Sequence, residues 1–92
     1  MTREEFIKYL KTQKGKTVIL ELKGIINTKL KIKEMQIKFE KGYLTLLSKE
    51  SEFQEIKLNL HQLIRVKKLE ENKILLEFDQ LQSVTIEIKL FI

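Results

Sequence analysis

The sequence of 92 residues has no cysteine, proline, alanine or tryptophan, and only three glycines, one histidine and one aspartate. Without cysteine, the chain has no disulfide framework, no thiolate metal site and no cysteine nucleophile, and it suits a reducing compartment without requiring one. Arginine is also rare, with two residues against 16 lysines, and residues with G/C-rich codons are scarce. This usage indicates an A/T-rich genome, such as that of a bacterium or a mobile element.

The rest of the composition is typical of a small soluble globular domain. Apolar residues make up 42% of the chain and charged residues 34%. This is too apolar for a disordered chain, and charges interrupt it too often for a membrane span. The length predicts a single domain over residues 1–92. The N-terminus carries Glu4 and Glu5 where a signal peptide would have an apolar run, so we expect a cytoplasmic protein.

The first residues predict a short helix over about 2–14. Thr2 and Glu5 have the spacing of a capping box, in which each side chain accepts a hydrogen bond from a free backbone N–H at the helix start. Gly15 is a suitable stop for the helix. The apolar residues that follow the cap at helical spacing are Phe6, Ile7, Tyr9 and Leu10.

From residue 16 onward, alternating apolar and polar residues predict five to seven short antiparallel strands. The apolar positions change from even to odd after Lys33 and Glu34, so we expect a β-bulge or a sharp bend there. A second bend is expected near His61 and Gln62, where the alternation is interrupted. The fold class is therefore mainly β (α+β). The helix caps a small barrel or, as the alternative, lies on one face of a strongly bent sheet.

The order of a short helix, the segment GKTVILELKG at 15–24 and a bent second strand resembles the start of Sm-like small β-barrels. The similarity covers roughly residues 2–78 and implies RNA binding and ring assembly through edge strands. Sm-like proteins usually carry an Asp and an Asn around the turn between their second and third strands, but residues 35–43 have neither. They also have a glycine after an arginine where this chain has Val66, and the chain continues into a further strand, 83–92. None of the family's RNA-contact residues is therefore transferred.

Groups that carry chemistry are few. His61 is the single histidine, and pairing with a serine would allow catalysis, although a polar residue at a strand bend is the simpler interpretation. The acid pairs Glu50/Glu52 and Glu70/Glu71 can approach a metal, but solvated turn residues are more common. The glycines do not cluster at a helix start, as a phosphate-binding loop requires. We therefore expect a non-enzymatic protein with no metal and no cofactor.

The positive charge is confined to the first part of the chain. Residues 1–41 contain 11 Lys and Arg against five Glu, net +6, whereas residues 42–92 have a net charge of −1. We predict a lysine-rich face that binds RNA or DNA mainly through phosphates. Stacking partners for single strands would be Tyr9, Tyr43 or Phe53. The alternative is a lysine coat that keeps the surface soluble and protects strand edges. The lysines of the predicted face are Lys8, Lys11, Lys14, Lys16, Lys23, Lys29, Lys31 and Lys33.

The last strand is apolar up to its end. Such a strand either packs against the helix and the other strands or forms an interface with a second copy of the chain. The residues of this predicted interface are Ile86, Ile88, Leu90, Phe91 and Ile92. The sequence thus leaves two functions open. One is a nucleic-acid-binding module, and the other is a protein-interaction or homo-oligomerising module that uses this strand.

Overall fold

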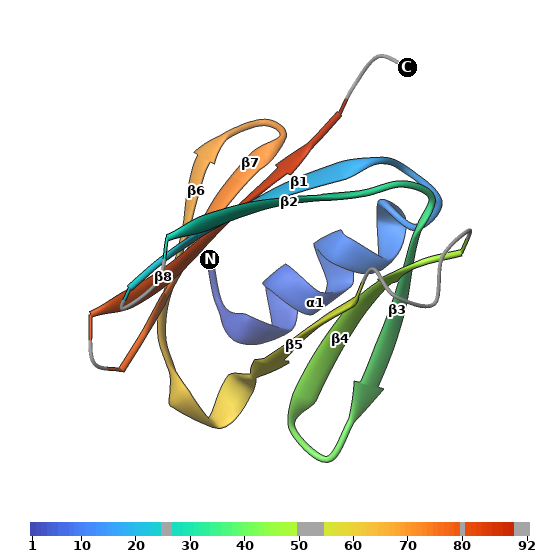
Figure 1. Cartoon of the computed structure of the whole chain (residues 1–92). Helices are drawn as coiled ribbons and strands as arrows, with labels where there is room; N and C mark the ends of the chain where they lie inside the picture. The colour runs from blue at the N-terminus through green and yellow to red at the C-terminus, as the bar shows by residue number, and fades with distance from the viewer. Residues whose placement is uncertain (25–26, 50–54, 80, 90–92) are drawn as a thin grey trace.

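Figure 1 shows the computed structural model of the chain, which describes residues 1–24, 27–49, 55–79 and 81–89. In these residues one helix is followed by eight antiparallel strands, so the fold is mainly β, as predicted. The predicted number of five to seven strands is too low, because two bent segments each divide into two strands. The elements are α1 (Arg3–Thr12), β1 (Val18–Lys23), β2 (Thr28–Ile32), β3 (Met35–Glu40), β4 (Tyr43–Ser48), β5 (Glu55–Asn59), the 3-10 helix η1 (Leu60–Gln62), β6 (Leu63–Glu70), β7 (Lys73–Phe78) and β8 (Gln82–Ile88).

The strands form two sheets with α1 between them (Figure 1). The large sheet has five strands in the order β2-β1-β8-β7-β6, and the small sheet has three in the order β3-β4-β5. The buried Phe6 and Leu10 of α1 share one hydrophobic core with side chains from both sheets. The sheets are not closed into a barrel, so the prediction of a small barrel capped by the helix is wrong, because α1 lies between the sheets and covers their apolar inner faces (Figure 1). We call the faces turned away from α1 the outer faces.

The capping box predicted at the start of the helix is present. The Thr2 N–H donates to Glu5 Oε1 (3.0 Å), and the Glu5 N–H donates to Thr2 Oγ1 (3.1 Å). The helix ends at Thr12, two residues before the predicted end. Gly15 then turns the chain with φ of +90°, a conformation that favours glycine.

Tyr9 holds α1 against the large sheet. Its hydroxyl donates to the carbonyl oxygen of Glu71, in the turn between β6 and β7 (3.1 Å). Burial, followed by the charge of Glu71, raises the pKa of Tyr9 above its ordinary value of 10.0. The folded chain therefore favours the neutral phenol. This contribution to stability is present below pH 10 and is lost as the pH rises through the raised pKa.

Both predicted bends are confirmed. Between β2 and β3, Glu34 has φ of +48°, and the buried positions change from the even Ile32 to the odd Met35. At the second bend, η1 starts with a cap in which the His61 N–H donates to Asn59 Oδ1 (3.0 Å). At each bend the chain leaves one sheet and enters the other.

The C-terminal strand is not at an edge. β8 lies between β1 and β7 in the large sheet, and Ile86 and Ile88 are each 1% exposed in the core. These two residues therefore cannot form the predicted interface, because their side chains already pack inside the molecule. The other three predicted interface residues, at 90–92, lie outside the described residues.

Candidate nucleic-acid interface

The chain after α1 is attached to the bend between β2 and β3. The Gly15 N–H donates to the Met35 carbonyl oxygen (2.8 Å), and the Met35 N–H donates to the Lys16 carbonyl oxygen (2.9 Å). Ser48, at the end of β4, donates a hydrogen bond from its hydroxyl to the Lys33 carbonyl oxygen (2.8 Å). Three segments that are distant in the sequence therefore meet at this end of the molecule.

Two lysines from the second half of the chain join the same place. The Lys49 N–H donates to the Glu34 carbonyl oxygen (3.3 Å), and the Lys89 N–H donates to the Thr17 carbonyl oxygen (2.8 Å). We call the exposed lysines on these segments and on the last turn of α1 the corner cluster: Lys11, Lys14, Lys16, Lys33, Lys49 and Lys89. Sequence reasoning missed Lys49 and Lys89, because only long-range hydrogen bonds bring them to the others.

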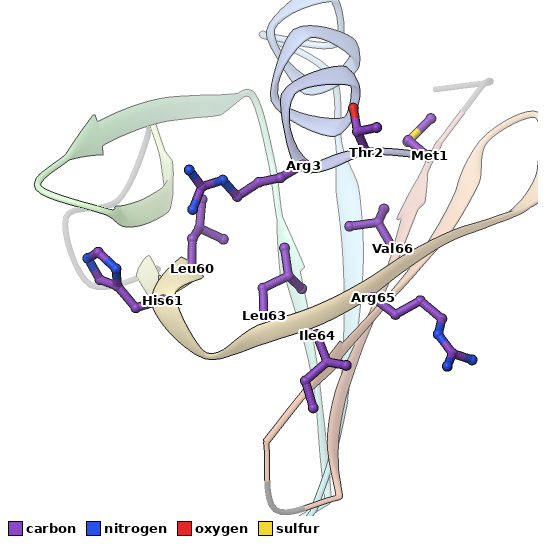
Figure 2. A pocket seen from close by; sticks show the side chains of 9 residues that line it. All are labelled: Met1, Thr2, Arg3, Leu60, His61, Leu63, Ile64, Arg65 and Val66. Carbon is purple, nitrogen blue, oxygen red and sulfur yellow. The ribbon is translucent and has the colours of Figure 1, made fainter.

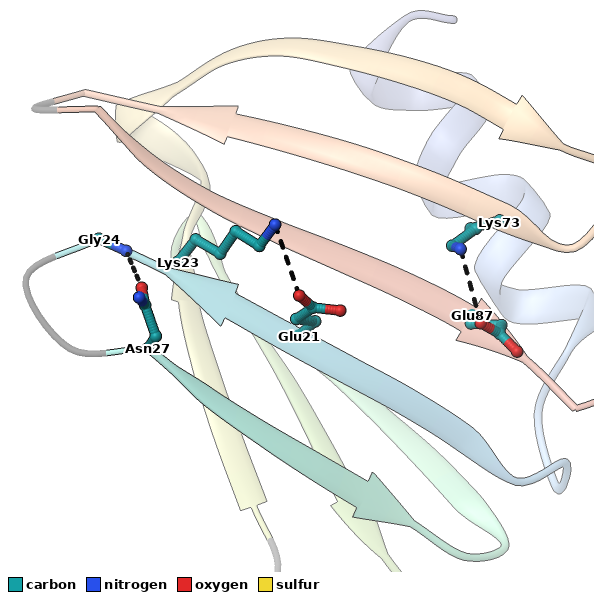
Figure 3. A network of polar contacts seen from close by, with 6 residues as sticks. All are labelled: Glu21, Lys23, Gly24, Asn27, Lys73 and Glu87. Carbon is teal, nitrogen blue, oxygen red and sulfur yellow. Dashed lines mark hydrogen bonds and ion pairs between the residues drawn. The ribbon is translucent and has the colours of Figure 1, made fainter.

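Some lysines on the outer face of the large sheet lie beside carboxylates. Lys73 Nζ lies 3.8 Å from Glu87 Oε2, and Lys23 Nζ lies 3.5 Å from Glu21 Oε1 (Figure 3). At the end of β1, the Gly24 N–H donates to Asn27 Oδ1 (3.2 Å). Neighbouring carboxylates thus offset the charges of these two lysines. The remaining pairs are Lys67–Glu77 (3.4 Å) between β6 and β7 and Lys68–Glu71 (3.7 Å) at their turn.

The lysines of the corner cluster have no such partners. The described part of the chain forms four ion pairs, and none of them includes a residue of the corner cluster. Glu34 is the acid in the backbone bend itself, and its side chain is exposed. The corner cluster is therefore an exposed patch of lysines that form no ion pair with any residue the structure describes.

All eight lysines predicted to bind nucleic acid are exposed, but the structure divides them. Four belong to the corner cluster, and Lys8 lies one helical turn before it on α1. Lys29 and Lys31 are on the outer face of the edge strand β2. Lys23 is at the far end of β1, roughly 17 Å from its start for a six-residue strand, and pairs with Glu21. The eight predicted lysines are thus all exposed, and four of them lie in the corner cluster.

The outer face of the small sheet adds an aromatic ring to the basic surface. Tyr43 is 38% exposed, and Lys57 Nζ lies 5.4 Å from the centre of its ring. Such a contact contributes about 0.5–1 kcal/mol at an exposed site. The neighbouring row pairs Lys38 with Thr45 and Thr45 with Lys57, so two lysines flank a threonine that is 7% exposed.

A hollow of about 580 Å³ lies beside the start of α1 (Figure 2). Both arginines of the chain and its single histidine line it, together with Ile64, which is 63% exposed. Arg3 extends toward the side of His61, whereas Arg65 points away on the other side of β6 (Figure 2). The side chains of Arg3 and Arg65 therefore do not converge on one point (Figure 2).

His61 has a packing role. Lys41 and Gly42 form the turn between β3 and β4 with φ of +53° and +81°. The His61 ring lies so close to Gly42 that any side chain at this position would collide with the ring. This contact places the His61 ring against the β3–β4 turn. Within the described ranges, no group of three or more His, Asp or Glu side chains is placed to hold a metal ion.

The comparisons with known proteins add no family. No protein-family model matches the sequence, and no curated protein or solved structure matches it either. The resemblance to Sm-like proteins therefore stays a prediction. In the part of the chain that the structure describes, no helix is long and apolar enough to cross a membrane.

Proposed function

We propose that this chain is a non-enzymatic module that binds the phosphate backbone of a nucleic acid through the corner cluster. One observation supports this function: six exposed lysines from separate chain segments meet at one end, and none forms an ion pair in the described residues. Lysines that neutralise phosphates release the counterions condensed on the nucleic acid, and this release supplies most of the free energy of such binding.

The choice of lysine indicates which part of the nucleic acid the chain binds. A lysine ammonium is a point charge that contacts phosphate without the bidentate geometry that reads a base. The proposed binding is therefore largely independent of base sequence. We choose RNA as the ligand because the start of the sequence resembles that of Sm-like proteins, although the two sheets are not closed into the barrel of that family. The cytoplasmic location predicted from the sequence belongs to the same proposal.

The test compares two triple variants with the same change in net charge. Lys16→Gln, Lys33→Gln and Lys49→Gln remove corner-cluster lysines, whereas Lys67→Gln, Lys68→Gln and Lys73→Gln remove ion-paired ones. Binding of a fluorescent RNA is measured by anisotropy over a series of salt concentrations. We expect the corner variant to lose affinity roughly tenfold or more at low salt and to reduce the slope of log K against log salt by about 2–3.

The ion-paired variant should retain most of the affinity, because its lysines are already offset by glutamates. Equal losses in the two variants would mean that net charge alone drives binding, which contradicts a defined site. Absence of any complex between the unaltered chain and RNA or DNA at low salt would contradict the function itself.

A second candidate function is a protein-interaction module. Ile64 favours it, because this side chain is 63% exposed on β6 beside the hollow that both arginines line. An aliphatic side chain flanked by arginines suits a partner surface with apolar and acidic residues. If the partner is a second copy, light scattering should detect a dimer that Ile64→Lys dissociates. A strict monomer at high concentration would exclude the self-assembling form.

A further inference from the structure

The outer face of β4 connects the corner cluster with Tyr43. Tyr43, Thr45 and Leu47 lie on this face, because side chains of a strand alternate between its two sides. β4 ends at Ser48, directly before Lys49 of the corner cluster. The distance from Tyr43 to Lys49 along the strand is roughly 20 Å at about 3.4 Å per residue. The corner cluster and the exposed Tyr43 ring therefore lie at the two ends of one track along β4, which the row of Leu47 and Glu55 crosses.

The charges along this track are arranged in rows across the small sheet. The central row joins Lys38, Thr45 and Lys57, and both lysines are exposed. Glu40 and Glu55 lie in the rows on either side and line the same shallow hollow of about 410 Å³. Because carboxylates repel phosphate, an anion is favoured along the central row, next to the Tyr43 ring.

We propose that the ligand is a single-stranded nucleic acid that stacks one base on Tyr43 and places its adjacent phosphates on Lys38 and Lys57. This inference rests on the proposed function, because the corner cluster binds the backbone of the same strand. Proteins that bind single strands combine a basic groove with aromatic side chains on which bases stack. In a duplex, neighbouring base pairs cover the faces of each base, so an aromatic ring on a flat sheet cannot reach them.

The contact between Lys57 and Tyr43 is compatible with this role. Lys57 Nζ lies over the ring, 5.4 Å from its centre, so in the free chain the ammonium group lies above the ring face on which a base would stack. A cation–π contact at an exposed site is weaker than the stacking of a base on a ring. The arriving base therefore displaces the ammonium group, which is then available for a phosphate.

Tyrosine fluorescence gives a direct test. The chain has two tyrosines and no tryptophan, so Tyr9→Phe leaves Tyr43 as the only strong emitter. The probes are an oligouridine of about 12 nucleotides, within the range of site sizes for small single-strand-binding folds, and an RNA duplex of equal length. We expect the single strand to quench the emission of Tyr43 and the duplex to leave it unchanged.

Affinity measurements complete the test. Tyr43→Ser should weaken oligouridine binding roughly 5- to 100-fold, the range expected for the stacking of one base, and leave duplex binding unchanged. Tyr43→Phe keeps the ring and should bind like the unaltered chain. Circular dichroism verifies that each variant is folded. If Tyr43→Ser does not fold, the double variant Lys38→Gln and Lys57→Gln replaces it, with the expected loss of preference for the single strand.

The outcomes separate this inference from the proposed function. If oligouridine binds Tyr43→Ser as tightly as the unaltered chain, while the corner variant still loses affinity, the stacking site is overturned and the backbone-binding function stands. If oligouridine and duplex both fail to bind the unaltered chain at low salt, the proposed function fails as well.

Discussion

The outer face of the large sheet and the corner cluster both carry exposed lysines, but the two regions differ in what surrounds each lysine. Across β6, β7 and β8 of the large sheet, strand pairing places glutamates beside Lys67 and Lys73, as for Lys73 and Glu87 at 3.8 Å. At the corner, the lysines lie at the ends of elements and in bends, and none of them forms an ion pair with a residue that the structure describes. The number of lysines in a stretch of sequence therefore does not measure free positive charge. Strand register accounts for two of the four ion pairs, Lys67–Glu77 and Lys73–Glu87.

The largest expected effect on stability comes from weakening the packing of α1 in the core. This helix leads directly into the corner cluster. Phe6 is 0% exposed, and Phe6→Ala should reduce the free energy of unfolding by about 3–5 kcal/mol. Phe39→Ala makes the same chemical change at a side chain that is 47% exposed, so it should cost much less. Urea unfolding measures both. Similar losses would show that α1 does not anchor the corner.

A smaller effect is expected at the start of the same helix. Thr2→Ala removes the cap and should cost about 1 kcal/mol at neutral pH, whereas Thr28→Ala, at an exposed threonine that caps no helix, should cost little. The hydrogen bond from the Thr2 backbone N–H, followed by the Thr2 side chain, lowers the pKa of Glu5 below its ordinary value of 4.5.

The lowered pKa of Glu5 determines how the stability of the chain changes with pH. The ionised Glu5 is favoured in the folded chain, so its contribution is present above pH 4.5 and is lost as the pH falls through the lowered pKa. The difference between the unaltered chain and Thr2→Ala should therefore shrink below pH 4.5. Urea unfolding over a pH series checks this, and a difference that grows in acid would contradict the cap.

The smallest effect on stability is expected for single lysine substitutions in the two regions. Lys73→Gln breaks an ion pair whose side chains are each 35% exposed, so it should lower stability by about 0.2–1 kcal/mol. Lys33→Gln relieves repulsion within the corner cluster, so it should leave stability unchanged or raise it. At about 1 M salt, where the Debye length is about 3 Å, the two variants should converge. Loss of stability in both at low salt would remove the distinction between the two regions.

Local features of the fold were predictable from the sequence. The capping box depends on two residues three positions apart, and the bend at Glu34 depends on a change in parity along one strand. The order of strands was not predictable in this way. Nothing in the alternation of Ile86 and Ile88 shows that β8 lies between β1 and β7. The prediction of a barrel was wrong because the alternation of residues does not reveal that α1 lies between the two sheets.

The candidate site was predictable in part. The excess of lysines along residues 1–41 predicted exposed side chains correctly, because an ammonium group must stay in contact with water. It also included Lys23, which lies at the far end of β1 and pairs with Glu21, two positions earlier on the same strand. It omitted Lys49 and Lys89, because hydrogen bonds across long sequence separations bring them to the corner. Tyr43 was identified as a possible stacking residue, but its neighbour Lys57 becomes visible only through strand pairing.

The central position of β8 has a consequence for how the chain is made. Val18 pairs with Ile88, 70 positions later, so the large sheet cannot be completed until residue 88 has left the ribosome. Until then, β1 and β7 both present unpaired edges and apolar faces, which are prone to join other chains. Pairing over such a separation also slows folding. We therefore expect the nascent chain to depend on chaperones during synthesis, even though the finished domain is small.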